Sequence, residues 1–265
     1  MKHTTIDRNF GRQAFGDDPA AYHATRPDYP AWVFETLSDR CGLAPGTPTF
    51  EIGPGTGKAT LPLLNRSANP LLAIEPDRRL AAFLRRTIPH GALRILEAPF
   101  ESAPLPEAAF TLGLAATAFH WLDENAALTK VARLLRPGGW WAMVCNVFGD
   151  PNRADPFHEA TKSLLEGPES PSAGVSSLPF ALDAPARLAA LRATQAFDNI
   201  EHQTRSWQLV LDPDQVTALY ATYSNLRIRP DRTALLAELK RIAREQFAGR
   251  VTRNMVTSLY IARRT

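Results

Sequence analysis

The chain of 265 residues carries 45% hydrophobic residues and a formal net charge of only +3. This composition supports a sizeable core, gives no sign of disorder and gives little reason to expect a nucleic-acid partner. Two cysteines without metal-ligand spacing predict a reducing compartment, by default the cytoplasm, and no metal site. No apolar run could span a membrane and the first eight residues lack a signal core, so we expect no membrane segment and no secretion.

Short apolar runs alternate with amphipathic helical patterns along most of the chain. This alternation is typical of a parallel sheet covered on both faces, with its ligand at the carboxyl edge. The predicted strands span residues 49–52, 71–74, 93–96, 110–115, 140–144, 199–211 and 256–262. The predicted helices span residues 32–41, 58–65, 77–87, 124–135, 213–223 and 232–247, and we expect residues 1–30 to be irregular.

We expect a single domain built from four parts. Residues 1–45 form an N-terminal arm and helix, and residues 46–147 form the cofactor-binding core. Residues 148–196 begin with a stretch rich in proline and glycine that predicts a helical cap insertion, because functional lids concentrate in such segments. Residues 197–265 supply the C-terminal strands and helices.

The sequence Phe-Glu-Ile-Gly-Pro-Gly-Thr-Gly at residues 50–57 predicts a cofactor loop between a strand and a helix. Counted from Gly53, a dinucleotide motif would need its third glycine at Lys58, and the phosphate loop of nucleotide triphosphatases does not fit either. Glu51 places a carboxylate where a pyrophosphate would be repelled. The loop therefore predicts a ligand with a cationic or donor-rich group.

A second acid, Glu75, ends the predicted strand 71–74 and lies twenty-two residues beyond Gly53. In a doubly wound sheet an acid at this edge accepts hydrogen bonds from ribose hydroxyls. An adenosine with a charged tail that is not a phosphate fits both acids.

With these motifs the chain resembles the class I S-adenosylmethionine-dependent methyltransferases, in particular the small-molecule group that includes trans-aconitate methyltransferases. Residues 50–57, 73–76 and 135–139 resemble the first motif, the second motif and the turn before the fifth strand. The resemblance implies S-adenosylmethionine as cofactor. It also implies a Rossmann-like, doubly wound, seven-stranded, mostly parallel α/β sheet with an antiparallel last strand.

Residues 98–107 resemble the family stretch that lines the adenine, but Pro99 stands where the family has aspartate. Proline offers no side-chain acceptor, so the adenine amino group would need a backbone carbonyl or Glu101, and the backbone N–H of Phe100 would bind the ring. The resemblance assigns cofactor binding to ten residues: Arg26, Glu51, Gly53, Gly55, Gly57, Glu75, Pro76, Phe100, Glu101 and Ala116.

The segment that holds Tyr22, Arg26 and Tyr29 resembles the arm that closes over the cofactor in small-molecule members of the family. Arg26 could bind the methionine carboxylate, for which its planar guanidinium is well suited, or could form a surface ion pair with Asp28 or Glu35. Tyr22 could cover the cofactor and act in catalysis, or could simply pack against the sheet edge.

The edge of the fourth strand, residues 115–121, should face the reactive methyl group. It lacks the motifs of enzymes that methylate DNA bases, so a small-molecule acceptor is favoured. His120 is the candidate general base, with a hydrogen-bonded structural role as the alternative, although alignment alone can support methyl transfer. Trp121, Tyr220 and Tyr223 could line the acceptor pocket or belong to the core.

We therefore expect a methyltransferase that methylates oxygen, nitrogen or carbon of a small metabolite and that works as a monomer or homodimer. One alternative is a non-catalytic S-adenosylmethionine-binding module. The other is an RNA methyltransferase, for which the basic residues near the C-terminus would form the polyanion site instead of a solvated helix face.

Overall fold

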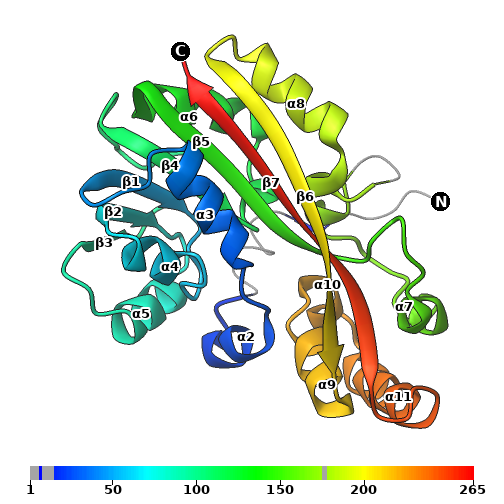
Figure 1. Cartoon of the computed structure of the whole chain (residues 1–265). Helices are drawn as coiled ribbons and strands as arrows, with labels where there is room; N and C mark the ends of the chain where they lie inside the picture. The colour runs from blue at the N-terminus through cyan, green and yellow to red at the C-terminus, as the bar shows by residue number, and fades with distance from the viewer. Residues whose placement is uncertain (1–5, 8–14, 175–177) are drawn as a thin grey trace.

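The computed structural model describes residues 6–7, 15–174 and 178–265, which form one seven-stranded sheet flanked by helices (Figure 1). The strand order is β3-β2-β1-β4-β5-β7-β6. The strands are β1 (Thr47–Ile52), β2 (Ala68–Ile74), β3 (Leu93–Leu96), β4 (Phe110–Ala116), β5 (Leu135–Phe148), β6 (Phe197–Leu211) and β7 (Val251–Arg264). The first five strands pair in parallel and β7 pairs antiparallel with both β5 and β6, which confirms the predicted fold class.

The chain reverses its direction of winding between β1 and β4. It steps outward from β1 to β2 and β3 and then returns to place β4 on the other side of β1. Such a switch point leaves a crevice at the carboxyl ends of the strands, where doubly wound folds bind their ligands. The topology therefore locates the functional edge before any side chain is considered.

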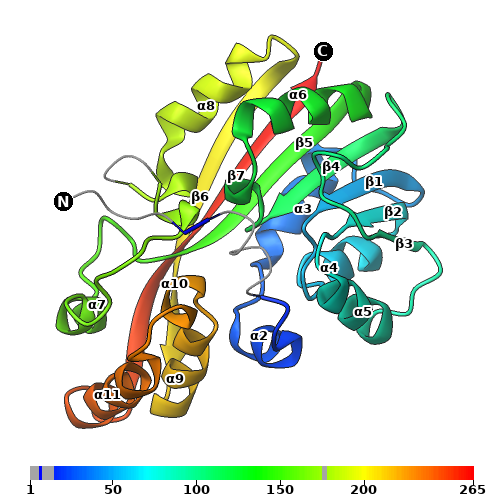
Figure 2. The same ribbon diagram turned by 180° about the vertical axis from the view of Figure 1, so that it is seen from behind.

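Helices cover both faces of the sheet, as Figures 1 and 2 show from opposite sides. The α-helices are α2 (Pro19–Thr25), α3 (Ala31–Arg40), α4 (Thr60–Asn65), α5 (Arg78–Thr87), α6 (Glu124–Leu134), α7 (Pro156–Thr161), α8 (Ala184–Ala193), α9 (Pro213–Ala221), α10 (Ser224–Arg227) and α11 (Arg232–Glu245). Three short 3₁₀ turns are η1 (Phe119–Trp121), η2 (Pro171–Ala173) and η3 (Phe180–Leu182).

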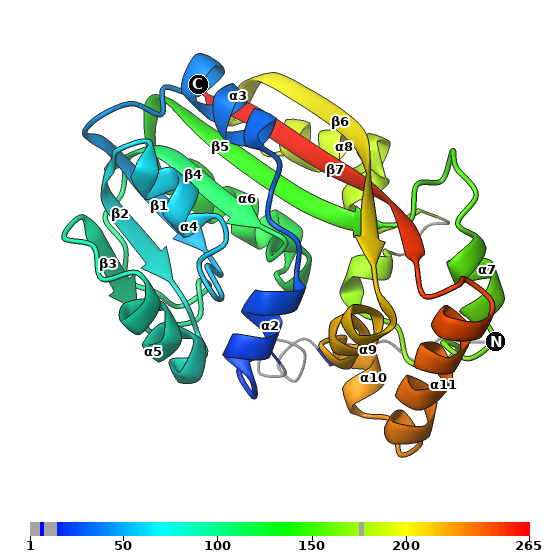
Figure 3. The same ribbon diagram turned by 60° about the horizontal axis from the view of Figure 1, so that its bottom comes forward.

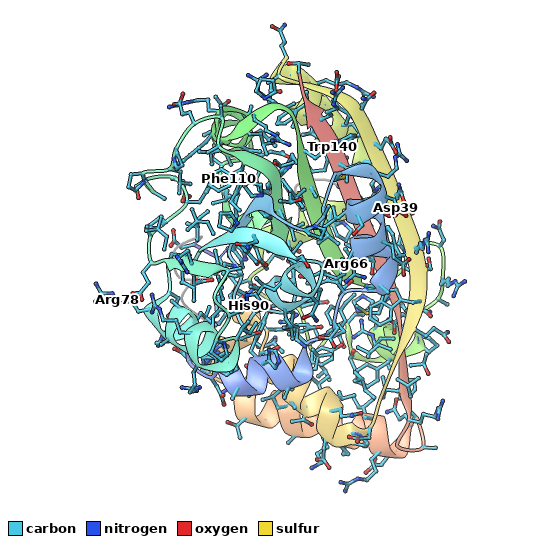
Figure 4. All side chains as sticks on the ribbon, turned by 60° about the vertical axis from the view of Figure 1, so that its left-hand side comes forward. Asp39, Arg66, Arg78, His90, Phe110 and Trp140 are labelled. Atoms are coloured by element: carbon cyan, nitrogen blue, oxygen red, sulfur yellow. The ribbon has the colours of Figure 1, made fainter. Side chains whose placement is uncertain are left out.

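Each face of the sheet has its own hydrophobic core. On one face Leu63 of α4 packs in the same cluster as Leu112 of β4, and on the other Leu128 of α6 clusters with Trp141 of β5. Helix α5 is amphipathic: Leu84 is buried, whereas Arg78 points outward from the body of the protein (Figure 4). Burial on both faces explains why the central strands are nearly continuous apolar runs.

A third hydrophobic cluster lies beyond the end of the sheet, where β6 and β7 extend past their neighbours (Figure 3). Phe157 of α7, Leu219 of α9 and Leu239 of α11 are fully buried in it. This cluster fixes α9 and α10 beside the carboxyl edge of the sheet.

Two expectations about secondary structure were wrong. Strands β5 and β7 are longer than the predicted 140–144 and 256–262, because their antiparallel pairing continues to Phe148 and Met255. Residues 19–25, expected to be irregular, form helix α2. Asp18 caps this helix by accepting a hydrogen bond from Ala21 N, and Pro19 occupies a first-turn position, so an N-terminal signal was present in the sequence.

Candidate active site

The glycine loop follows β1 and has φ angles of +61°, +57° and +89° at Gly53, Gly55 and Gly57. A Cβ atom on Gly57 would lie 2.5 Å from Ile88, so this glycine allows the segment after α5 to pack against the loop. A Cβ on Gly55 would meet no atom within 4 Å. Gly55 therefore presents bare backbone to open space, as a loop that receives a ligand requires.

Glu75 ties this loop to the end of β2. Its carboxylate accepts hydrogen bonds from Gly55 N and from Asp77 N, each at 3.0 Å. The side chain is only 3% exposed, and this burial raises the pKa of Glu75 to about 7. A carboxylate has about four lone-pair positions, so acceptor capacity is left for a ligand.

Glu51 lies behind the loop and does not line the cavity in front of it. It is fully buried, and its Oε2 accepts a 2.7 Å hydrogen bond from Thr60 Oγ1 of α4. Its other oxygen, Oε1, is buried without a hydrogen-bond partner, and burial raises the pKa of Glu51 to about 7. An unpartnered buried carboxylate oxygen is costly unless a donor or cation arrives nearby.

The first cavity opens at the carboxyl edge between β1, β2 and β4 and has a volume of about 130 Å³. It is the crevice that the topology predicts. Nine of the twelve predicted site residues line it: Tyr22, Arg26, Gly53, Gly55, Glu75, Pro76, Phe100, Glu101 and Ala116.

A lysine that sequence reasoning missed holds the predicted adenine loop from behind. Lys130 Nζ of α6 donates to the carbonyl oxygens of Phe100 and Ala103 at 2.7 and 2.6 Å. The ring of Phe100 is buried and stacks parallel to Phe50, with the ring centroids 6.4 Å apart. The loop is thus fixed although Pro99 replaces the family aspartate.

Arg26 joins the N-terminal arm to α9. Its Nε and Nη2 donate to the hydroxyl and the carbonyl oxygen of Thr222 at 3.0 and 3.3 Å. Its guanidinium carbon lies 4.7 Å from the ring centroid of Tyr223 and 5.2 Å from that of Tyr22. Arg26 makes no ion pair with any described residue, so the surface pair proposed as an alternative is wrong; Asp28 pairs with Lys58 at 2.7 Å.

A second cavity, with a volume of about 320 Å³, adjoins the first. The two share a wall formed by residues from the arm and from the ends of β4 and β5: Phe15, Tyr22, Arg26, Thr117, Trp121, Asn146 and Phe148. Residues from the predicted cap, including Phe180 of η3, close the far side of the second cavity. The two cavities thus meet at the exit of β4.

His120 lines the second cavity and is 6% exposed. Burial lowers the pKa of His120 to about 3, so its imidazole is neutral at physiological pH. Its ring forms no hydrogen bond with the described residues, which does not support the structural role considered as the alternative. The neutral ring is therefore free to bond to a ligand.

The three aromatic candidates for the acceptor pocket separate in the structure. Trp121 lines both cavities and Tyr223 lines the second. Tyr220 lines neither and belongs to the core: its hydroxyl accepts a hydrogen bond from Arg253, which pairs with Asp155 at 2.7 Å. Spacing could not distinguish these residues, because a helix end presents some side chains to the core and others to the cavity.

Tyr29 and Thr117 form a second contact that sequence reasoning missed. The Tyr29 hydroxyl donates to Thr117 Oγ1 at 2.7 Å beside the exit of β4. Thr117 has a φ of +52°, an uncommon backbone conformation for a β-branched residue. No sequence signal predicts this conformation, because it follows from how β4 leaves the sheet.

The sheet order, the glycine loop after β1 and the acid after β2 together define the class I methyltransferase fold. Residues 50–143 match the family described as a methyltransferase domain. Residues 50–143 are therefore a methyltransferase domain, similar to that of the class I S-adenosylmethionine-dependent methyltransferases.

Its relatives agree with this assignment. The chain is 33% identical over 142 residues to an uncharacterized methyltransferase of Mycobacterium bovis, covering 54% of this chain and 56% of that protein. It is 32% identical over 139 residues to a trans-aconitate 2-methyltransferase of Sinorhizobium medicae, covering 50% and 48%. The chain thus spans about half the length of these curated relatives.

A solved structure supports the fold. A putative type II methyltransferase from Anaeromyxobacter dehalogenans superimposes with a TM-score of 0.61 at 24% identity, covering 90% of this chain and 97% of that one. Among the described residues, none of the helices is long and apolar enough to cross a bilayer. Within the same residues, no three acids, histidines or cysteines gather where they could hold a metal ion.

Proposed function

We propose that this protein transfers a methyl group from S-adenosylmethionine to a small-molecule acceptor. The observation that carries the proposal is the pair of adjoining cavities that meet at the exit of β4. The first has the glycine loop and Glu75, and the second has aromatic residues and His120. A non-catalytic binding module would need only the first.

The residues of the first cavity fit the cofactor. Gly55 leaves its backbone open, and Glu75 retains acceptor capacity beside it. Thr56 Oγ1, in the loop that lines this cavity, is buried without a hydrogen-bond partner. A ligand that carries an ammonium group, a sulfonium centre and ribose hydroxyls would supply the missing positive charge and donors.

Arg26, from the N-terminal arm, provides the cation for the carboxylate of the cofactor. Two of its nitrogens are used by Thr222, and Nη1 has no described hydrogen-bond partner. The guanidinium carries a positive charge that no described acid neutralises. We assign it to the methionine carboxylate of the cofactor, with Tyr22 covering the same space.

When bound, the cofactor supplies an electrophilic methyl group on sulfur. The chain aligns the acceptor for in-line attack, with Trp121 and Phe148 lining both cavities where they meet. The neutral His120 accepts a hydrogen bond from the acceptor and receives its proton as the new bond forms. Its low pKa makes it a weak base in the free protein, so alignment contributes more than proton transfer.

Calorimetry with S-adenosylmethionine, S-adenosylhomocysteine and NADH tests cofactor choice. We expect micromolar binding of the first two and none of NADH, whereas preferential NADH binding would refute the proposal. Turnover of radiolabelled cofactor with a metabolite extract tests catalysis. Binding without any labelled product would favour the non-catalytic module.

The RNA methyltransferase alternative makes a separate prediction, which is strong RNA affinity that falls steeply with salt. The charges on the C-terminal helix do not favour it. Arg241 on α11 pairs with both Glu238 and Glu245, and Lys240 pairs with Asp214. These pairs leave a mixed, solvated helix face.

A further inference from the structure

The second cavity is unusually aromatic. Aromatic residues make up 9% of the chain but six of the twenty described residues that line this cavity. They come from five separate segments: Phe15, Tyr22, Trp121, Phe148, Phe180 and Tyr223. A cavity of this composition favours a flat, conjugated ligand, because aromatic faces stack on one another.

The charges in the cavity oppose a polyanionic ligand. The described lining contains one permanent cation, Arg26, and one acid, Glu169. Under the proposed function Arg26 is already used by the cofactor carboxylate. Since no other cation lines the described wall, an acceptor with several carboxylates would be desolvated without compensation and would face Glu169.

The wall from the cap is held in place before any ligand arrives. The guanidinium carbon of Arg187 lies 3.7 Å from the ring centroid of Phe180, and its Nη1 donates to the Phe180 carbonyl oxygen at 3.1 Å. Arg187 also pairs with Glu124 of α6 at 2.7 Å, and both side chains are mostly buried. The ring of Phe180 is therefore a preformed surface for stacking.

His120 favours a ligand that carries a hydrogen-bond donor. Its side chain is more than nine-tenths buried, lines the cavity and has no described hydrogen-bond partner. A neutral imidazole nitrogen in this position accepts a hydrogen bond from an O–H group.

We propose that the second cavity takes a planar, uncharged, conjugated hydroxyl compound of the phenol class and that the protein methylates its oxygen. This inference rests on the proposed function and names the acceptor of the same site. The acceptor oxygen forms a bond to the methyl carbon while the carbon–sulfur bond breaks and its electron pair stays on sulfur. The hydroxyl proton passes to His120 and then to water.

The test measures binding to the full chain loaded with S-adenosylhomocysteine. We expect 2-naphthol to bind at least tenfold more tightly than trans-aconitate by calorimetry. Phe180→Leu should weaken naphthol binding about fivefold and leave the affinity for S-adenosylhomocysteine unchanged. The matched control is Phe247→Leu, because Phe247 packs against Phe157 in the third core and lines neither cavity.

The outcomes separate the two proposals. Absence of naphthol binding, tighter binding of trans-aconitate, or equal effects of the two leucine substitutions would overturn the acceptor assignment while leaving the methyltransferase proposal standing. Failure of the wild type to bind S-adenosylhomocysteine, with naphthol binding still dependent on Phe180, would overturn the cofactor proposal and support the aromatic site.

Discussion

The two cavities are built in different ways. Apart from the wall that the two cavities share, the first is lined mainly by two short stretches at the ends of β1 and β2. The second is assembled from the arm, η1, the end of β5, the cap and the start of α10. Under the proposed function, the cofactor is thus bound largely by local motifs, whereas the acceptor is bound by segments that only the tertiary fold brings together.

The largest effect is expected from a substitution that blocks the glycine loop of the first cavity. Gly55→Val forces a β-branched residue into a φ of +57° and places its side chain in the open space of the cavity. We expect the affinity for S-adenosylhomocysteine to fall more than a thousandfold, which corresponds to roughly 4 kcal/mol. Calorimetry measures this affinity.

Gly46→Val is the matched control for this change. Gly46 also has a positive φ, +81°, and no neighbour for a Cβ, but it lies in the turn before β1. Both variants should lose similar stability, and only the first should lose cofactor binding. Equal losses of binding would show that backbone strain, not the cavity, is responsible.

The pH dependence of stability tests the buried acid behind the loop. Burial raises the pKa of Glu51 from 4.5 to about 7, so the folded state holds a proton that the unfolded state releases between these values. The stability contributed by this proton is complete below pH 4.5 and is lost as the pH rises through 7. Between pH 5 and 8 the loss is roughly 2 to 3 kcal/mol for this group.

Glu51→Gln should remove that part of the pH slope and should stabilise the ligand-free protein at pH 8. Urea unfolding at the two pH values measures both effects. Glu107→Gln is the control, because Glu107 is an exposed partner of Arg133. A pH slope unchanged by Glu51→Gln would refute the raised pKa.

An effect of intermediate size is expected at Arg26, which lies in the wall shared by the two cavities. Arg26→Lys keeps the charge but loses the paired bonds to Thr222 and the stacking on Tyr223. We expect the KM for S-adenosylmethionine to rise about tenfold, with kcat reduced less than twofold. An effect confined to the acceptor KM would reassign Arg26 to the second cavity.

The smallest effect is expected at Asp17, which connects the N-terminal arm to α5 and α10 through two ion pairs. Helix α2 lies between α5 and α9 (Figure 3), and Asp17 just before it pairs with Arg79 and with Arg227, the latter at 2.6 Å. Because the pairs are half exposed, Asp17→Asn should speed cofactor dissociation only about threefold, and the difference should vanish in 1 M salt. Asp39→Asn on α3, labelled in Figure 4, is the control; stopped-flow dissociation measures both.

The contrast also explains what the sequence could predict. The positions of Gly55 and Glu75 at the first cavity could be predicted because motif spacing and strand order determine them, and the parallel core followed from apolar runs. The lengths of β5 and β7 could not be predicted, because the pairing of Phe148 with Met255 joins segments more than a hundred residues apart. The hydrogen bond between Tyr29 and Thr117 joins similarly distant residues and has no local signature.

The site residues that behave differently from expectation have a common physical reason. Glu51 and Gly57 do not line the first cavity. Alternate residues of a strand point to opposite faces, and a tight turn directs some groups toward the ligand and others toward the protein interior. The sequence shows that a glutamate and a glycine at these positions are unusual for a hydrophobic core. It does not show on which side of the backbone they lie.

The buried pair of Arg253 and Asp155 has a consequence for how substrate preference can change. Together with Tyr220 it anchors the end of α9, and the next two residues, Thr222 and Tyr223, hold Arg26. The wall that the two cavities share is therefore held in place from the protein interior. Under the proposed function, mutations in the cap alone would change the acceptor and leave the geometry of methyl delivery unchanged.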